Sequence, residues 1–196
     1  RLAQAGFIVI SVGQRGGHPS RSKWYHNYGY GNMRDYPLAD HKYAIEQLAN
    51  RHSFIDIDKV GIHGHSGGGF MSTAAICQYP DFFKVAVSCA GNHDNTIYNR
   101  WWSETHHGVK ETVSEKGDTT FVYKIGTNPE IASKLKGHLL LVHGDIDNNV
   151  HPGNTMRVAE ALIRSGKRFD MLMLPKQRHG FGDMNEYFYW RLVDYF

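Results

Sequence analysis

One serine stands in a setting that suits covalent catalysis. Ser66 lies in the stretch GIHGHSGGGF (61–70), where Gly64-His65-Ser66-Gly67-Gly68 fits the pattern G-x-S-x-G. A short apolar run precedes this stretch and a helical pattern follows it, as in a sharp strand-to-helix turn that lifts a serine hydroxyl above a sheet. A phosphate-binding loop is disfavoured because its Gly-Lys-Ser/Thr ending is absent. Ser66 is therefore a candidate nucleophile, and a glycine-rich turn with an incidental serine is the alternative.

A serine nucleophile needs a base, and the base needs an orienting acid. At a turn of this kind the partners follow the serine in the chain order acid, then histidine. HLLLVHGDIDNNVHP (138–152) supplies Asp145 and Asp147 just after an apolar run, and RFDMLMLPKQRHGF (168–181) supplies His179 after the next. The sequence predicts that His179 is the base, and the residues alone leave Asp145 and Asp147 both open as the acid.

The other titratable residues indicate no further site. His63 and His143 end apolar runs, and His65 flanks the serine. They are interpreted as ordinary polar residues or as residues that support a neighbouring functional group. His106 and His107 are adjacent, but no Cys or carboxylate cluster at metal-ligand spacing accompanies them, so no metal and no cofactor are expected. Two cysteines provide no disulfide framework and are predicted to be buried thiols.

Short apolar runs alternate with helical patterns along the chain. Such runs are typical of parallel strands covered on both faces, and five are present: 6–12, 59–63, 84–90, 138–144 and 168–174. Helices are predicted from Pro37 onward, over Phe70 to Gln78, and from near Pro152 to a capping glycine at Gly166. The alternation predicts an α/β fold, a three-layer sandwich whose mostly parallel sheet has helices on both faces.

Two long segments interrupt this rhythm, residues 13–36 and 91–136. The first is predicted to be a loop, and the aromatic residues of the second favour an ordered segment that covers a pocket. The 196 residues are enough for one domain, and a net charge of only +3 without a basic stripe argues against nucleic-acid binding. The chain opens without a methionine, and we expect it to be part of a longer protein.

The motifs GHSGGG, HGDIDNNVHP and RHGF together resemble the catalytic domain of the prolyl oligopeptidase family, most closely its dipeptidyl peptidase IV branch. The resemblance runs from LAQAGFIVISVGQRGG (2–17) to the C-terminus. It implies that residues 1–196 are the C-terminal part of an α/β-hydrolase peptidase domain whose first strands, and a β-propeller domain, lie upstream. A homodimer and a periplasmic or extracellular location are compatible with it.

The resemblance also implies roles for individual residues. It places the triad aspartate at Asp147 rather than Asp145, and the first oxyanion donor at the N–H of Gly67. Asn149 matches a residue that holds a substrate carbonyl, and Val150 matches a pocket wall. Tyr98 and Trp102 fall near two aromatic residues that line a proline pocket. Arg15, in the turn GQRGG, is expected to be structural.

The chain departs from the pattern where the dipeptidyl peptidase branch has a tyrosine directly after its serine, because Gly67 stands there. The family's second oxyanion donor and its amine-binding acids would lie upstream of Arg1. The resulting expectation is a serine peptidase that hydrolyses short peptides through a Ser66–Asp147–His179 triad, with dipeptidyl release after proline as the specific form implied by the resemblance. A serine esterase or acyl esterase of the same fold is the alternative.

Overall fold

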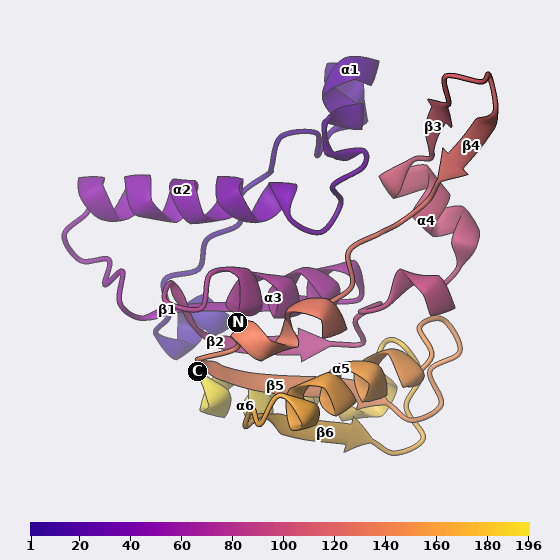
Figure 1. Cartoon of the computed structure of the whole chain (residues 1–196). Helices are drawn as coiled ribbons and strands as arrows, with labels where there is room; N and C mark the ends of the chain where they lie inside the picture. The colour runs from indigo at the N-terminus through magenta and orange to yellow at the C-terminus, as the bar shows by residue number, and fades with distance from the viewer.

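The computed structural model describes all residues from 1 to 196. Its centre is a parallel sheet of four strands in the order β1-β2-β5-β6: Val60–His65, Phe83–Cys89, His138–Gly144 and Asp170–Leu174. The four strands of this sheet lie side by side in the order in which they occur along the chain (Figure 1). Four of the five predicted strands are thereby confirmed.

The fifth predicted strand, over residues 6–12, is wrong. These residues form no strand, and β1 is an edge of the sheet with β2 as its only neighbour. A strand needs a neighbour to pair its N–H and C=O groups, and nothing in this chain pairs with this segment. Phe7 instead packs edge-on against Phe196, at 5.9 Å between ring centroids, while Ile8 and Val9 are each 54% exposed.

Helices cover both faces of the sheet. On one face α3 (Gly67–Gln78), α5 (Gly153–Arg164), the 3-10 turn Pro129–Lys134 and the start of α2 (Tyr36–Arg51) enclose the larger core. On the other face α6 (Asn185–Tyr195), which was not predicted from the sequence, covers the smaller core. Leu139 and Leu141 point into the first core, and Leu140 and Val142 into the second. This alternation explains why the run 138–144 is apolar throughout.

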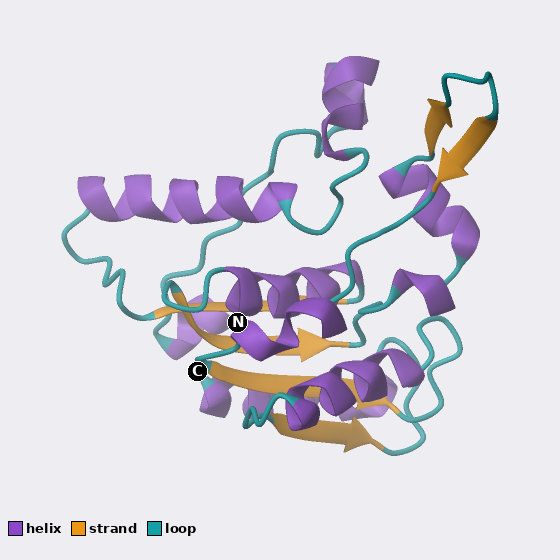
Figure 2. Cartoon of the chain, in the orientation of Figure 1, coloured by secondary structure: helices purple, strands orange, loops and turns teal.

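The two long segments between the regular elements differ in how much secondary structure they contain. Residues 13–36, predicted to be a loop, contain two short 3-10 turns and the single-turn helix α1 (Lys23–His26). The predicted ordered segment 91–136 contains α4 (Arg100–His107) and an antiparallel hairpin of β3 (Lys110–Val113) and β4 (Thr119–Val122). Figure 2 shows this hairpin projecting away from the sheet. None of the helices has the length and apolar character that crossing a bilayer requires.

Candidate active site

Ser66 occupies the turn between β1 and α3. Its backbone angles are φ 61° and ψ −122°, in a region that residues other than glycine rarely adopt. The Ser66 N–H donates to the carbonyl of Cys89 at 2.8 Å, which ties the turn to the end of β2. Such strain persists only where the surrounding structure enforces it, and here it presents the hydroxyl at the carboxyl edge of the sheet.

The glycines around Ser66 differ in whether their surroundings leave room for a side chain. A Cβ on Gly64 would lie 2.3 Å from the carbonyl oxygen of Gly68, and a Cβ on Gly69 would lie 2.3 Å from that of Cys89. These two positions exclude any side chain because α3 packs directly on β1 and β2. A Cβ on Gly68 would meet nothing within 4 Å, and one on Gly67 would meet only Trp102, at 3.9 Å.

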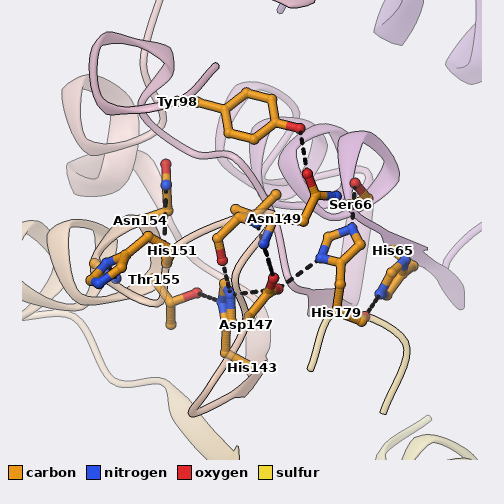
Figure 3. A network of polar contacts seen from close by, with 12 residues as sticks. His65, Ser66, Tyr98, His143, Asp147, Asn149, His151, Asn154, Thr155 and His179 are labelled. Atoms are coloured by element: carbon orange, nitrogen blue, oxygen red, sulfur yellow. Dashed lines mark hydrogen bonds and ion pairs between the residues drawn. The ribbon is translucent and has the colours of Figure 1, made fainter. Parts of the chain in front are cut away.

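The imidazole of His179 bridges the serine and an acid (Figure 3). His179 lies in the loop after β6, with Nε2 2.9 Å from Ser66 Oγ and Nδ1 2.7 Å from Asp147 Oδ2. A proton on Nδ1 satisfies the carboxylate and leaves Nε2 free to accept the hydroxyl proton. The structure thus brings together the three residues that the sequence singled out.

Asp147 follows β5 and is buried, with 3% of its surface exposed. Its Oδ1 accepts hydrogen bonds from the N–H groups of Asn149 at 2.9 Å and Val150 at 3.0 Å. Burial acts to raise the pKa of this carboxyl, but the hydrogen bonds from His179 and the two N–H groups outweigh it and hold the pKa below its usual value. The carboxyl is therefore an anion at neutral pH. Asp145 is exposed, and no contact joins its carboxylate to the ring.

Two histidines support this chain of contacts, which is one of the two interpretations that the sequence left open for them. His143 is fully buried at the end of β5; its Nδ1 lies 2.7 Å from Thr155 Oγ1, and its Nε2 lies 2.8 Å from the Val150 carbonyl oxygen and 3.2 Å from Asp147 Oδ2. His65 contacts the main chain of His179. Their position at the carboxyl ends of two strands, next to the candidate triad, was a signal available in the sequence.

The proposed substrate-binding residues lie around the same edge. The Tyr98 hydroxyl donates to Asn149 Oδ1 at 3.3 Å, and the Tyr98 ring packs on Trp102 at 5.5 Å between centroids. Trp102 faces Gly67, whose N–H is at the first position of α3 and has no partner within the helix. The Val150 side chain is fully buried, so it presents no open surface in this structure. The roles of all these residues in binding stay predictions.

The remaining residues that the sequence analysis named lie elsewhere. The guanidinium of Arg15 donates three hydrogen bonds to the carboxylate of Asp40, at 2.7, 3.0 and 3.1 Å, and so ties the turn after residue 12 to α2. His106 packs on Trp102 with the two ring planes tilted by 52°, whereas His107 is buried. No set of three or more His, Cys, Asp or Glu side chains is arranged to hold a metal ion. Cys77 and Cys89 are free, buried thiols as predicted.

Comparison with known proteins adds independent information about the chain. The family model described as the prolyl oligopeptidase family matches residues 1–196. Human dipeptidyl peptidase 8 is 33% identical over 181 residues, which is 91% of this chain and 19% of that protein. The chain thus spans about a fifth of the length of this curated relative.

Solved structures give the same result. A Bacteroides ovatus protein assigned as a dipeptidyl aminopeptidase IV superposes with a TM-score of 0.80 and 26% identity, covering 93% of this chain and 25% of that one. Dipeptidyl peptidase 4 of Porphyromonas gingivalis has a TM-score of 0.75 and 27% identity, covering 89% of this chain and 24% of that one. The parallel sheet with helices on both faces is that of an α/β-hydrolase. The chain therefore belongs to the prolyl oligopeptidase family of serine peptidases.

Proposed function

We propose that the protein is a serine peptidase that hydrolyses short peptides through a Ser66–His179–Asp147 triad and an acyl-enzyme. The observation that carries the proposal is the continuous hydrogen-bonded chain from Ser66 Oγ through His179 to a buried, ionised Asp147, at a strained strand-to-helix turn. Family membership supports peptide bonds as the substrate class.

The first half-reaction forms the acyl-enzyme. His179 Nε2 takes the proton of the Ser66 hydroxyl as Oγ bonds to the substrate carbonyl carbon, and the carbonyl electron pair moves onto oxygen. The Gly67 N–H, at the positive end of α3, donates to this oxyanion. The C–N bond then breaks, and the proton passes from Nε2 to the leaving amine.

The second half-reaction returns the enzyme to its starting state. A water molecule loses a proton to Nε2 and attacks the acyl carbon, the bond to Oγ breaks, and the proton returns to the Ser66 hydroxyl. Throughout, Asp147 holds Nδ1 protonated and stabilises the imidazolium, which is why its ionised state matters.

Release of dipeptides, including those that end in proline, is the specific form that we propose. The names of the relatives support it, as does the placement of Tyr98, Trp102 and Asn149 beside Ser66. Gly67 argues against a narrow pocket for the substrate proline. A side chain at this position would face Trp102 and form a second wall of that pocket, and glycine has none. The proposal includes an upstream β-propeller domain that limits access to short peptides, further catalytic-domain residues before Arg1, and a homodimer.

A fluorophosphonate probe tests the nucleophile in the full-length protein. We expect it to modify Ser66, identified by mass spectrometry of the labelled peptide, and to leave the Ser66→Ala variant unmodified. Labelling at another serine, or none at all, would contradict the mechanism.

A substrate panel tests the bond that is cleaved. We expect turnover of dipeptide amides as well as p-nitrophenyl esters, because the triad must protonate an amine leaving group as well as accept a proton. Hydrolysis of esters alone would identify an esterase with the same triad instead.

A further inference from the structure

His65, the residue directly before Ser66, contacts the residue that carries the candidate base. Its Nε2 lies 2.5 Å from the carbonyl oxygen of His179, and the two rings pack with centroids 4.6 Å apart and planes at 57°. Figure 3 shows His65 on the opposite side of His179 from Asp147. Three contacts therefore hold His179: Asp147 on Nδ1, Ser66 on Nε2, and His65 on the backbone.

The contact matters because it is made to the main chain of the candidate base itself. The hydrogen bond from His65 is the only one that the main chain of His179 makes. His179 lies in a loop outside any helix or strand, and two residues later Phe181 has a left-handed backbone, with φ 57°. The turn around His179 is closed by a hydrogen bond from the Phe181 N–H to the Arg178 carbonyl at 3.3 Å, whereas the carbonyl of His179 itself is held by a side chain from β1.

The chemistry of His65 suits this role. His65 stays exposed on one side, but packing of its ring against His179 and Phe181, at 5.5 Å between the His65 and Phe181 centroids, shields part of it from water. This shielding lowers the pKa of His65, as does the nearby His179, although the contact with the His179 carbonyl and the Asp147 charge oppose the shift. A neutral imidazole with its proton on Nε2 donates to the carbonyl and adds no positive charge beside an imidazolium formed on His179.

We propose that His65 is a positioning residue for the base: its Nε2–H fixes the His179 carbonyl, and its ring forms the wall against which the His179 imidazole keeps its direction toward Ser66. The inference rests on the proposed triad. In this proposal His65 affects the rate of the chemical step rather than substrate binding, because the contacts of His65 are with His179 and Phe181.

Three substitutions in the full-length protein separate the hydrogen bond from the ring. His65→Gln keeps an N–H donor near the position of Nε2, His65→Phe keeps a ring without a donor, and His65→Met keeps neither. We expect kcat for a dipeptide amide to fall about 10- to 100-fold in the Phe and Met variants, because a small displacement of a base has an effect of that size, and to fall further in the Met variant, which also loses the ring. KM should stay within about twofold, since the loss belongs to the base and not to binding.

The Gln variant is the decisive comparison. We expect it to recover most of the lost kcat, and its rate of fluorophosphonate labelling at Ser66 to exceed that of the Phe variant by a similar factor. Equal activity of the Phe variant and the unmodified protein would overturn the proposal, as would equal losses in the Gln, Phe and Met variants at unchanged melting temperature. A change confined to KM would also overturn it. Failure of the triad itself is recognised separately, by labelling that persists in Ser66→Ala.

Discussion

At the scale of single residues, the carboxylate of Asp147 is the most fully supported group of the site. Its Oδ1 accepts two backbone N–H groups, and its Oδ2 faces His179 Nδ1 at 2.7 Å and His143 Nε2 at 3.2 Å. A buried carboxylate with this many donors has one orientation, and that orientation fixes the tautomer of His179. Asp145, only two residues away, has no such partners.

The pair Asp147 and Asp145 therefore provides a matched test. We expect Asp147→Asn to lower kcat by about 10³- to 10⁴-fold, because an amide cannot hold the required tautomer of His179. The same change at Asp145 removes an exposed carboxylate and should leave kcat within about twofold. Steady-state kinetics on one dipeptide amide measures both. A large loss at Asp145 with little at Asp147 would reverse the assignment of the acid.

At the scale of elements, the site depends on how closely α3 approaches the sheet. Gly64 and Gly69 let the first turn of α3 lie against β1 and β2, and this approach forces Ser66 into its strained backbone. Farther along the carboxyl edge of the sheet, Arg157 on α5 forms an ion pair with Asp94. Asp94 caps the 3-10 turn Asn95–Ile97, which comes just before Tyr98. The turn of the nucleophile is thus positioned by packing against the sheet, and the start of the aromatic segment by an ion pair with α5.

Two glycines of the turn test this close approach. Gly69→Ala is expected to destabilise the protein by about 1–3 kcal/mol, because its methyl group would overlap the Cys89 carbonyl and α3 must move outward. Gly68→Ala is the control: it has free space within the helix and should be neutral or stabilising by up to about 1 kcal/mol. Thermal denaturation measures both changes. Similar destabilisation by the two variants would contradict the steric argument.

At the scale of the whole molecule, the segments at the carboxyl edge of the sheet contain several buried polar side chains. His93, Asn95, Asn128 and His143 are all almost fully inaccessible to water. Asn128 Nδ2 donates to the Phe70 carbonyl at 2.8 Å and lies 2.9 Å from His93 Nδ1, which joins the segment after β2 to α3. Burial, with a smaller contribution from His143, lowers the pKa of His93 to about 3.

This burial predicts that acid destabilises the fold. An unfolded histidine has a pKa of about 6.5, so between that pH and about 3 the unfolded chain binds a proton that folded His93 excludes. The stabilisation is fully present above about pH 6.5 and is lost as the pH falls, by up to about 1.4 kcal/mol per pH unit. We expect the melting temperature to decrease between pH 7 and 5.

The matching variant is His93→Gln, which keeps an acceptor for Asn128 but does not titrate. Its melting temperature should depend less steeply on pH over the same range. An unchanged slope would show that the acid sensitivity comes from other groups, such as buried His143, whose pKa burial also lowers.

The sequence by itself determined the four strands of the sheet, the turn at Ser66 and the order of the three polar residues. Periodicity and glycine spacing carry this information because they are local, and the family resemblance narrowed the acid to Asp147. The sequence did not reveal α6, whose Asn185–Tyr195 segment mixes aromatic and polar residues, and it predicted a strand at 6–12 that has no neighbour to pair with.

Only the tertiary structure decided which residues support the candidate triad. His65 and His179 are separated by 114 residues; His65 ends β1 and His179 follows β6, the two outer strands of the sheet. Their contact exists because the loop after β6 reaches back along the carboxyl edge to the end of β1. His143 gains its role from burial between α5 and the loop of Asp147. Local pattern indicates which side chains can react, whereas long-range packing sets their distances, their protonation and their direction.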